Sequence, residues 1–279
     1  MELKTIINKT FILRAVIFAV LFILTDLTLT TAGSYLLIQI IIDFILGVFI
    51  GFVFGIIFTL LYYTRLVRIG IAWFSLFIIQ WFNNIIEGYL FTTILTESLL
   101  LFAVGFGILI SFLHALFLGL LFPPKTTERS LRKEMKNYFN QRSWFNWLWR
   151  FALASLLYLV IYYGIGTLIS PIVLPYYLDM GTDLTVPPVW VILFVEPARG
   201  LLYILALLPF LLSLKLEQRV LYLLLVFALY LPSIAMLLPS PAFPLILRIV
   251  HGVFEILIDS LLFTAMIILL LKPRSIDSE

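Results

Sequence analysis

The sequence contains no cysteine and only two histidines, and charged residues make up 12% of its 279 residues. The absence of cysteine excludes a disulfide-bonded scaffold and any thiol chemistry. Soluble domains have about 25% charged and 45–50% apolar residues, whereas 63% of this chain is hydrophobic and its mean hydropathy is +1.15. These values predict an all-α integral membrane protein that has no soluble catalytic domain.

Three common catalytic motifs are also missing from the chain. GxxxxGK would bind nucleotide phosphates, HExxH would bind zinc, and GxSxG would present a serine nucleophile. The two histidines are too few to bind two haems through paired imidazoles. We therefore expect no cofactor, and the sequence favours a protein that is not an enzyme.

Long apolar runs are what the chain does contain. A helix needs about 20 apolar residues to cross the hydrocarbon core of a bilayer. Eight runs satisfy this requirement and predict eight transmembrane helices, at residues 11–32, 35–63, 69–95, 98–122, 148–174, 187–213, 220–238 and 244–271.

The distribution of basic residues predicts the orientation of these helices. Lys and Arg concentrate in cytoplasmic loops. With the N-terminus inside, the predicted outer loops contain no Lys or Arg, only the acidic residues Glu97, Asp179 and Asp183. We therefore expect both termini to be cytoplasmic in a multi-pass protein of the plasma (inner) membrane.

The longest polar segment, residues 123–147, is basic and rich in aromatic residues. Residues 130–139 place Leu131, Met135 and Tyr138 on one helical face, and four aromatic residues follow within 144–149. This pattern is typical of an interfacial helix that rests on anionic lipid. Nucleic-acid binding is the less favoured alternative, so no nucleic-acid partner is expected.

The same segment divides the chain into two halves that resemble each other, residues 1–122 and 148–279. Arg14 and Arg150 open the first apolar run of each half, and Ile108–Ser111 corresponds to Ile256–Asp259. Asp43 and Glu196 are each followed by a glycine four residues later. These correspondences predict two parallel four-helix repeats, an arrangement found in some carriers; chance similarity between apolar segments is the alternative.

Ionisable residues occur inside several predicted spans, where each costs at least about 2.5–3.5 kcal/mol near the bilayer centre. Asp43, Glu87, Glu196 and His251 lie at similar depths below the outer membrane boundary. Arg199 follows Glu196 by one helical turn, and the intervening Pro197 predicts a kink. Such a pair serves either as part of a carrier site or as a structural link between helices.

The last span carries Arg248, His251, Glu255 and Asp259 at spacings of three, four and four residues. In an α-helix these residues share one face, and this face must contact protein or water rather than lipid. The stripe could relay protons, hold a cation or pair with Arg199. The alternative is a polar seam that joins helices or subunits.

Four weaker features complete the candidate set. His114 is expected to be a hydrogen-bonded buried histidine, with membership of a site containing His251 as the alternative. Asn83 and Asn84 precede Glu87 by one turn and could bond neighbouring helices or a ligand. The glycines within 47–55, spaced by four residues, predict close helix packing.

The segment Ile85–Thr93 resembles the EExxxR motif of the CPBP (CAAX protease and bacteriocin-processing) intramembrane proteases. In that family, two glutamates, two histidines and a nearby Asn or Asp activate water. The resemblance would assign this role to Glu87, His114, His251 and Glu255. The chain departs from the motif because Gly88 and Thr92 replace its second glutamate and its arginine, and 137 residues separate the histidines.

Three functions follow from these features. The leading hypothesis is a membrane carrier or channel component that moves a proton, a cation or a small polar solute through the charged layer. The second is a non-catalytic subunit whose charges bind partner helices, in a larger complex or a homo-oligomer. The third is a degenerate CPBP-like intramembrane hydrolase.

Overall fold

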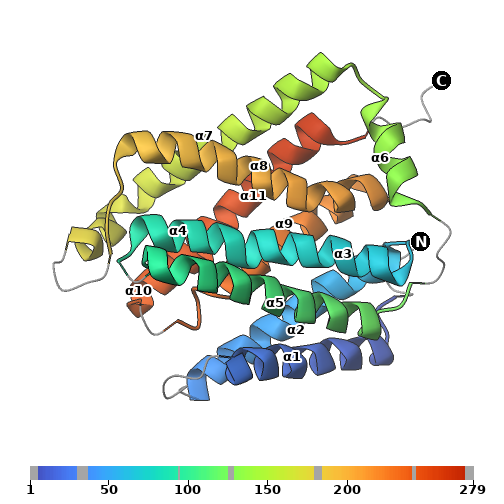
Figure 1. Cartoon of the computed structure of the whole chain (residues 1–279), viewed down its shortest axis with the longest axis horizontal. Coiled ribbons are helices and arrows are strands. Elements are labelled where there is room, and N and C mark those ends of the chain that lie inside the picture. The colour runs from blue at the N-terminus through green and yellow to red at the C-terminus, as the bar shows by residue number, and fades with distance from the viewer. Residues whose placement is uncertain are drawn as a thin grey trace.

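The computed structural model describes residues 6–29, 37–93, 95–124, 129–178, 184–240 and 243–273, with only the backbone of residues 26–29. Figure 1 shows a bundle of helices. In chain order they are α1 (Lys9–Leu29), α2 (Leu37–Leu60), α3 (Arg65–Leu76), the π-helix η2 (Phe77–Phe82), α4 (Asn83–Phe91), α5 (Glu97–Leu121), α6 (Leu131–Phe139), α7 (Trp144–Leu178), α8 (Val189–Ser213), α9 (Gln218–Ile234), α10 (Leu245–Leu247), the π-helix η3 (Arg248–Glu255) and α11 (Ile256–Leu271).

The predicted all-α class is confirmed for the described residues, whose one β-type contact is an isolated bridge between Thr92 and Leu184. Six helices are long and apolar enough to cross a membrane: α2, the continuous helix of α3, η2 and α4, α5, α7, α8, and the continuous helix of α10, η3 and α11. These helices indicate an integral membrane protein. The apolar helix α9 is shorter, with 17 residues, and the count of eight spans stays a prediction.

Two helices differ from their predicted spans. The predicted span 148–174 belongs to α7, which has 35 residues and includes Pro171 and Pro175. At 1.5 Å per residue, α7 is about 52 Å long, well beyond the hydrocarbon core of about 30 Å. The predicted span 244–271 contains the π-helix η3, which changes the faces on which its side chains lie.

Some contacts between helices of the first half have counterparts in the second half. In the first half α1 lies against α2, and α5 lies against α3 and α1; in the second half α7 lies against α8, and α11 lies against α9 and α7. The halves meet where α2 contacts α9 and α3 contacts α8. Buried apolar side chains from both halves form one core, including Phe54, Phe210 and Phe263.

Helix α6 lies at the end of the bundle where α8 and α11 finish (Figure 1). The Tyr138 hydroxyl donates to the carbonyl of Leu271 at 2.6 Å, and Arg129, which precedes the helix, donates to the carbonyl of Ser213 at 3.0 Å. Burial raises the pKa of Tyr138, which keeps the hydroxyl protonated as a donor. The connection between the two halves is therefore fastened to the C-terminal ends of two helices.

Candidate functional site

The buried guanidinium of Arg199 joins two helices through charged hydrogen bonds. Its Nη1 donates to both oxygens of the Glu196 carboxylate on the same helix, at 3.0 and 3.1 Å, and its Nη2 donates to Glu87 Oε2 on α4, at 2.8 Å. Its Nε donates to Asn83 Oδ1 at 3.3 Å. Arg199 is 3% exposed and Glu196 is fully buried, so these partners replace water around the charges.

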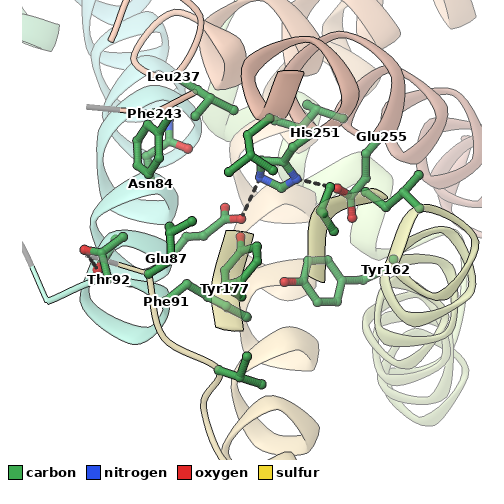
Figure 2. A pocket seen from close by; sticks show the side chains of 18 of the residues that line it. Asn84, Glu87, Phe91, Thr92, Tyr162, Tyr177, Leu237, Phe243, His251 and Glu255 are labelled. Atoms are coloured by element: carbon green, nitrogen blue, oxygen red, sulfur yellow. Dashed lines mark hydrogen bonds and ion pairs between the residues drawn. The ribbon is translucent and has the colours of Figure 1, made fainter. Parts of the chain in front are cut away.

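His251 extends the network from Glu87 to the last transmembrane segment. Its Nε2 lies 3.1 Å from Glu87 Oε1, and its Nδ1 bonds Oε2 of Glu255 one turn further along the chain. Figure 2 shows the imidazole between the two carboxylates. Glu87 therefore connects Arg199 with His251, and α4, α8 and η3 together carry one continuous network.

The local structure of these helices positions the network. Glu196 and Arg199 share a face because they are three residues apart, and α8 stays helical through Pro197. His251 and Glu255 belong to η3, and short π-helical segments occur often at functional sites. The charged groups thus come from continuous helices, one of which contains a π-helical segment.

The structure removes Arg248 from the expected stripe. A π-helix has more residues per turn than an α-helix, so residues three positions apart no longer share a face. The guanidinium of Arg248 instead donates to the carbonyl of Leu238 at 3.1 Å. Arg248 lines neither cavity, and its predicted alignment with His251 assumed α-helical periodicity.

A cavity of about 560 Å³ borders this network. Among the described residues that line it, the charged side chains are Glu87, His251 and Glu255, and most of the rest are aliphatic or aromatic. Figure 2 shows Tyr162, Tyr177 and Phe243 around the same space. The volume falls within the usual range of small-molecule sites.

A second, polar cavity of about 30 Å³ shares Glu87 and His251 with the first and is also lined by Arg199 and Asp259. This volume is sufficient for a water molecule. Asp259 is 8% exposed, and its Oδ1 has no hydrogen-bond partner. The small cavity therefore places polar space between the His251 network and an unpaired carboxyl oxygen.

Two candidate residues lie outside the network. Asp43 is buried in α2, at 3% exposure, and lines neither cavity. His114 lies between α5 and α1, where its Nε2 bonds the Thr25 hydroxyl at 2.9 Å and its ring stacks on Phe22. The role that the CPBP resemblance assigns to His114 beside Glu87 is therefore wrong.

The two asparagines before Glu87 have different positions. Asn83 receives the Arg199 bond and donates to the carbonyl of Ile78 at 2.9 Å. Asn84 lines both cavities, and its Nδ2 donates to the carbonyls of Gln80 and Ser233 at 2.6 and 3.1 Å. Asn83 thus supports Arg199, whereas Asn84 fixes the cavity wall to α9.

Sequence reasoning missed the tyrosines of α7. Tyr158 and Tyr162 line the small cavity, and Tyr162 and Tyr177 line the large one. The Arg199 guanidinium lies 5.8 Å from the centre of the Tyr162 ring. The spacing of Tyr158 and Tyr162 by four residues on one face was the signal that could have identified them.

No set of three His, Asp or Glu side chains in the described part of the chain is placed to hold a metal ion.

The comparisons find no family model, curated protein or solved structure that matches this chain.

Proposed function

We propose that this protein is a membrane carrier that binds its solute in the large cavity and exchanges protons through the network beneath it. The observation that supports this proposal is the network in which Glu87, His251 and Glu255 line the cavity and Glu87 also bonds Arg199. Ionisable groups inside a membrane protein mark ion and proton pathways.

Hydrogen bonds and polar space support the proton route. His251 bonds Glu255 and Glu87, so a proton on the imidazole has a carboxylate acceptor on each side. The small cavity has room for a water between this group and Asp259. Solute binding at Glu255 would thus alter the protonation of the other groups in the network.

The test is proton flux in liposomes that contain the purified protein and an internal pH dye. A potassium gradient with valinomycin provides the driving force. We expect the wild type to acidify the interior faster than protein-free liposomes, because the network can pass protons. We expect Glu255→Gln, which keeps the side-chain shape, to reduce the rate to background.

The matched control is Glu217→Gln, which makes the same change at an exposed position before α9. This variant should retain the wild-type rate. A wild-type rate equal to that of empty liposomes, or a Glu255→Gln rate equal to that of Glu217→Gln, would contradict the carrier proposal.

Intramembrane hydrolysis is the second candidate function. The 3.1 Å contact between Glu87 and His251 favours it, because a carboxylate and an imidazole at this distance could activate a water in the cavity. The test is incorporation of ¹⁸O from labelled water into membrane lipids or peptides. Incorporation that Glu87→Gln abolishes, together with no proton flux, would support hydrolysis over transport.

We also propose eight spans, with both termini and residues 123–147 on the cytoplasmic side of the plasma membrane. The bonds from Arg129 and Tyr138 support one common side, since they join the linker to the ends of α8 and α11. Trp144 and Phe145 are more than 70% exposed there, in keeping with contact to the anionic lipid expected at this surface.

Corresponding glycine contacts support the proposed parallel repeats. Gly47 packs on Ala19 of α1, and Gly200 packs on Ser155 of α7. Ala19 and Ser155 each lie five residues after the arginine that opens their half, Arg14 or Arg150. The first and second helices of each half therefore contact each other at corresponding residues.

A further inference from the structure

Most of the ionisable groups that line the large cavity are acidic. Glu87 and Glu255 contribute two carboxylates, His251 contributes one base, and no Lys or Arg is among the described residues that line it. Arg199 lies beneath, where Glu87 and Glu196 already bind its guanidinium. A cationic group in the cavity would therefore meet two acidic side chains and no arginine or lysine of the lining.

The charge balance of the whole network has the same sign. Together with Asp259, which also lines the small cavity, the network has four carboxyl groups, with Glu87, Glu196 and Glu255 as the other three, against the two bases Arg199 and His251. Asp259 is more than nine-tenths buried and leaves Oδ1 unpaired beside the small cavity. Buried charges require counter-charges, so this network favours protons or a positively charged ligand.

The walls select a ligand with an apolar body. Trp81, Phe91, Tyr177 and Phe243 provide aromatic faces, and Met236 and Leu237 are among the aliphatic and thioether groups beside them. Aromatic faces attract organic cations, above all quaternary ones. A small inorganic cation is favoured less, because no set of three described His, Asp or Glu side chains is placed to hold a metal ion.

We infer that the large cavity binds organic cations that carry an apolar or aromatic body, with the positive group directed at Glu255 and Glu87. This inference rests on the proposed carrier function, for which it names the substrate class. An anion of the same shape would face two carboxylates, and a neutral molecule would form no ion pair with either of them.

Gly166 of α7 provides a steric test at the charged end of the cavity. A Cβ atom at Gly166 would lie 3.7 Å from Glu255 Oε1, so a larger side chain there occupies the space beside this carboxylate. Gly164, two residues earlier on the same helix, has open space around its Cβ position. Gly166→Leu and Gly164→Leu therefore form a matched pair that leaves every charge in place.

The experiment measures equilibrium dialysis of the purified protein against tetraphenylphosphonium and tetraphenylborate, two ions of similar shape and opposite charge. Protein-free detergent micelles provide the background for each ion. We expect saturable binding of tetraphenylphosphonium alone. Glu255→Gln and Gly166→Leu should weaken it about tenfold or more, the scale of one lost cation contact, whereas Gly164→Leu should bind as the wild type does.

Thermal unfolding of each variant shows whether lost binding reflects a lost fold. Equal binding of the two ions, or wild-type affinity in Gly166→Leu, would overturn the inference. Proton flux without tetraphenylphosphonium binding would support the carrier function and contradict this substrate class. Binding of tetraphenylphosphonium without flux of protons or of this ion would support the binding site and contradict the carrier function.

Discussion

Arg199 connects more of the site than any other single residue described above. Its guanidinium bonds Glu196, Glu87 and Asn83, which lie on two helices. A buried ion pair repays the loss of hydration only when such bonds satisfy both partners. A planar guanidinium suits this position because its donors point in fixed directions toward two carboxylates.

At the residue scale, we predict that Arg199→Gln destabilises the protein strongly. The substitution leaves Glu87 and Glu196 buried without their counter-charge, and breaking such a pair costs about 3–5 kcal/mol. Thermal or denaturant unfolding in detergent measures the loss. Arg219→Gln, at an exposed position at the start of α9, is the control and should change stability by less than about 0.5 kcal/mol. Equal stability of the two variants would contradict the structural role of Arg199.

The helices depend on glycines where they approach most closely. A Cβ atom at Gly200 would lie 2.7 Å from Tyr158 Cβ, and one at Gly47 would lie 2.9 Å from Ala19 Cα. Both contacts are shorter than carbon atoms tolerate, so any side chain would push the helices apart. Small residues allow this approach in membrane bundles.

At the element scale, we predict that Gly47→Ala and Gly200→Ala each destabilise the protein by about 1–3 kcal/mol, the usual cost of overpacking. Gly105→Ala is the control, because its Cβ position in α5 is open. Alanine favours a helix over glycine, so this control should be neutral or slightly stabilising. Unfolding temperatures of the three variants provide the measurement, and a destabilised Gly105→Ala would show that the effect is not specific to packing.

The sequence predicted the helices better than the faces that they present. Apolar length identifies a membrane helix whatever its neighbours are, and all six membrane-length helices overlap predicted runs. A π-helix leaves no such mark, because it depends on how the backbone hydrogen bonds adjust under packing. For this reason the expected stripe retained His251 and lost Arg248.

At the scale of the molecule, depth in the membrane only partly determines which charged side chains contact each other. Asp43, Glu87, Glu196 and His251 were expected in one layer, and the structure joins the last three while Asp43 lies apart. Sequence gives a residue's position along its helix, whereas the neighbouring helix and its direction follow from packing of the whole bundle. The cavity could not be predicted for the same reason.

The orientation of the whole molecule yields the last prediction, and the lack of native cysteine makes it simple to test. Lys133 on α6 and Ser98 at the start of α5 are both exposed and belong to opposite predicted sides. In intact cells that express Lys133→Cys or Ser98→Cys, we expect a membrane-impermeant maleimide to label Ser98→Cys alone, because the basic linker should lie inside. After the cells are permeabilised both variants should react, which controls for thiol reactivity. Labelling of Lys133→Cys from outside would reverse the topology and would place Thr92 and Leu184, which line the large cavity, near the cytoplasmic side.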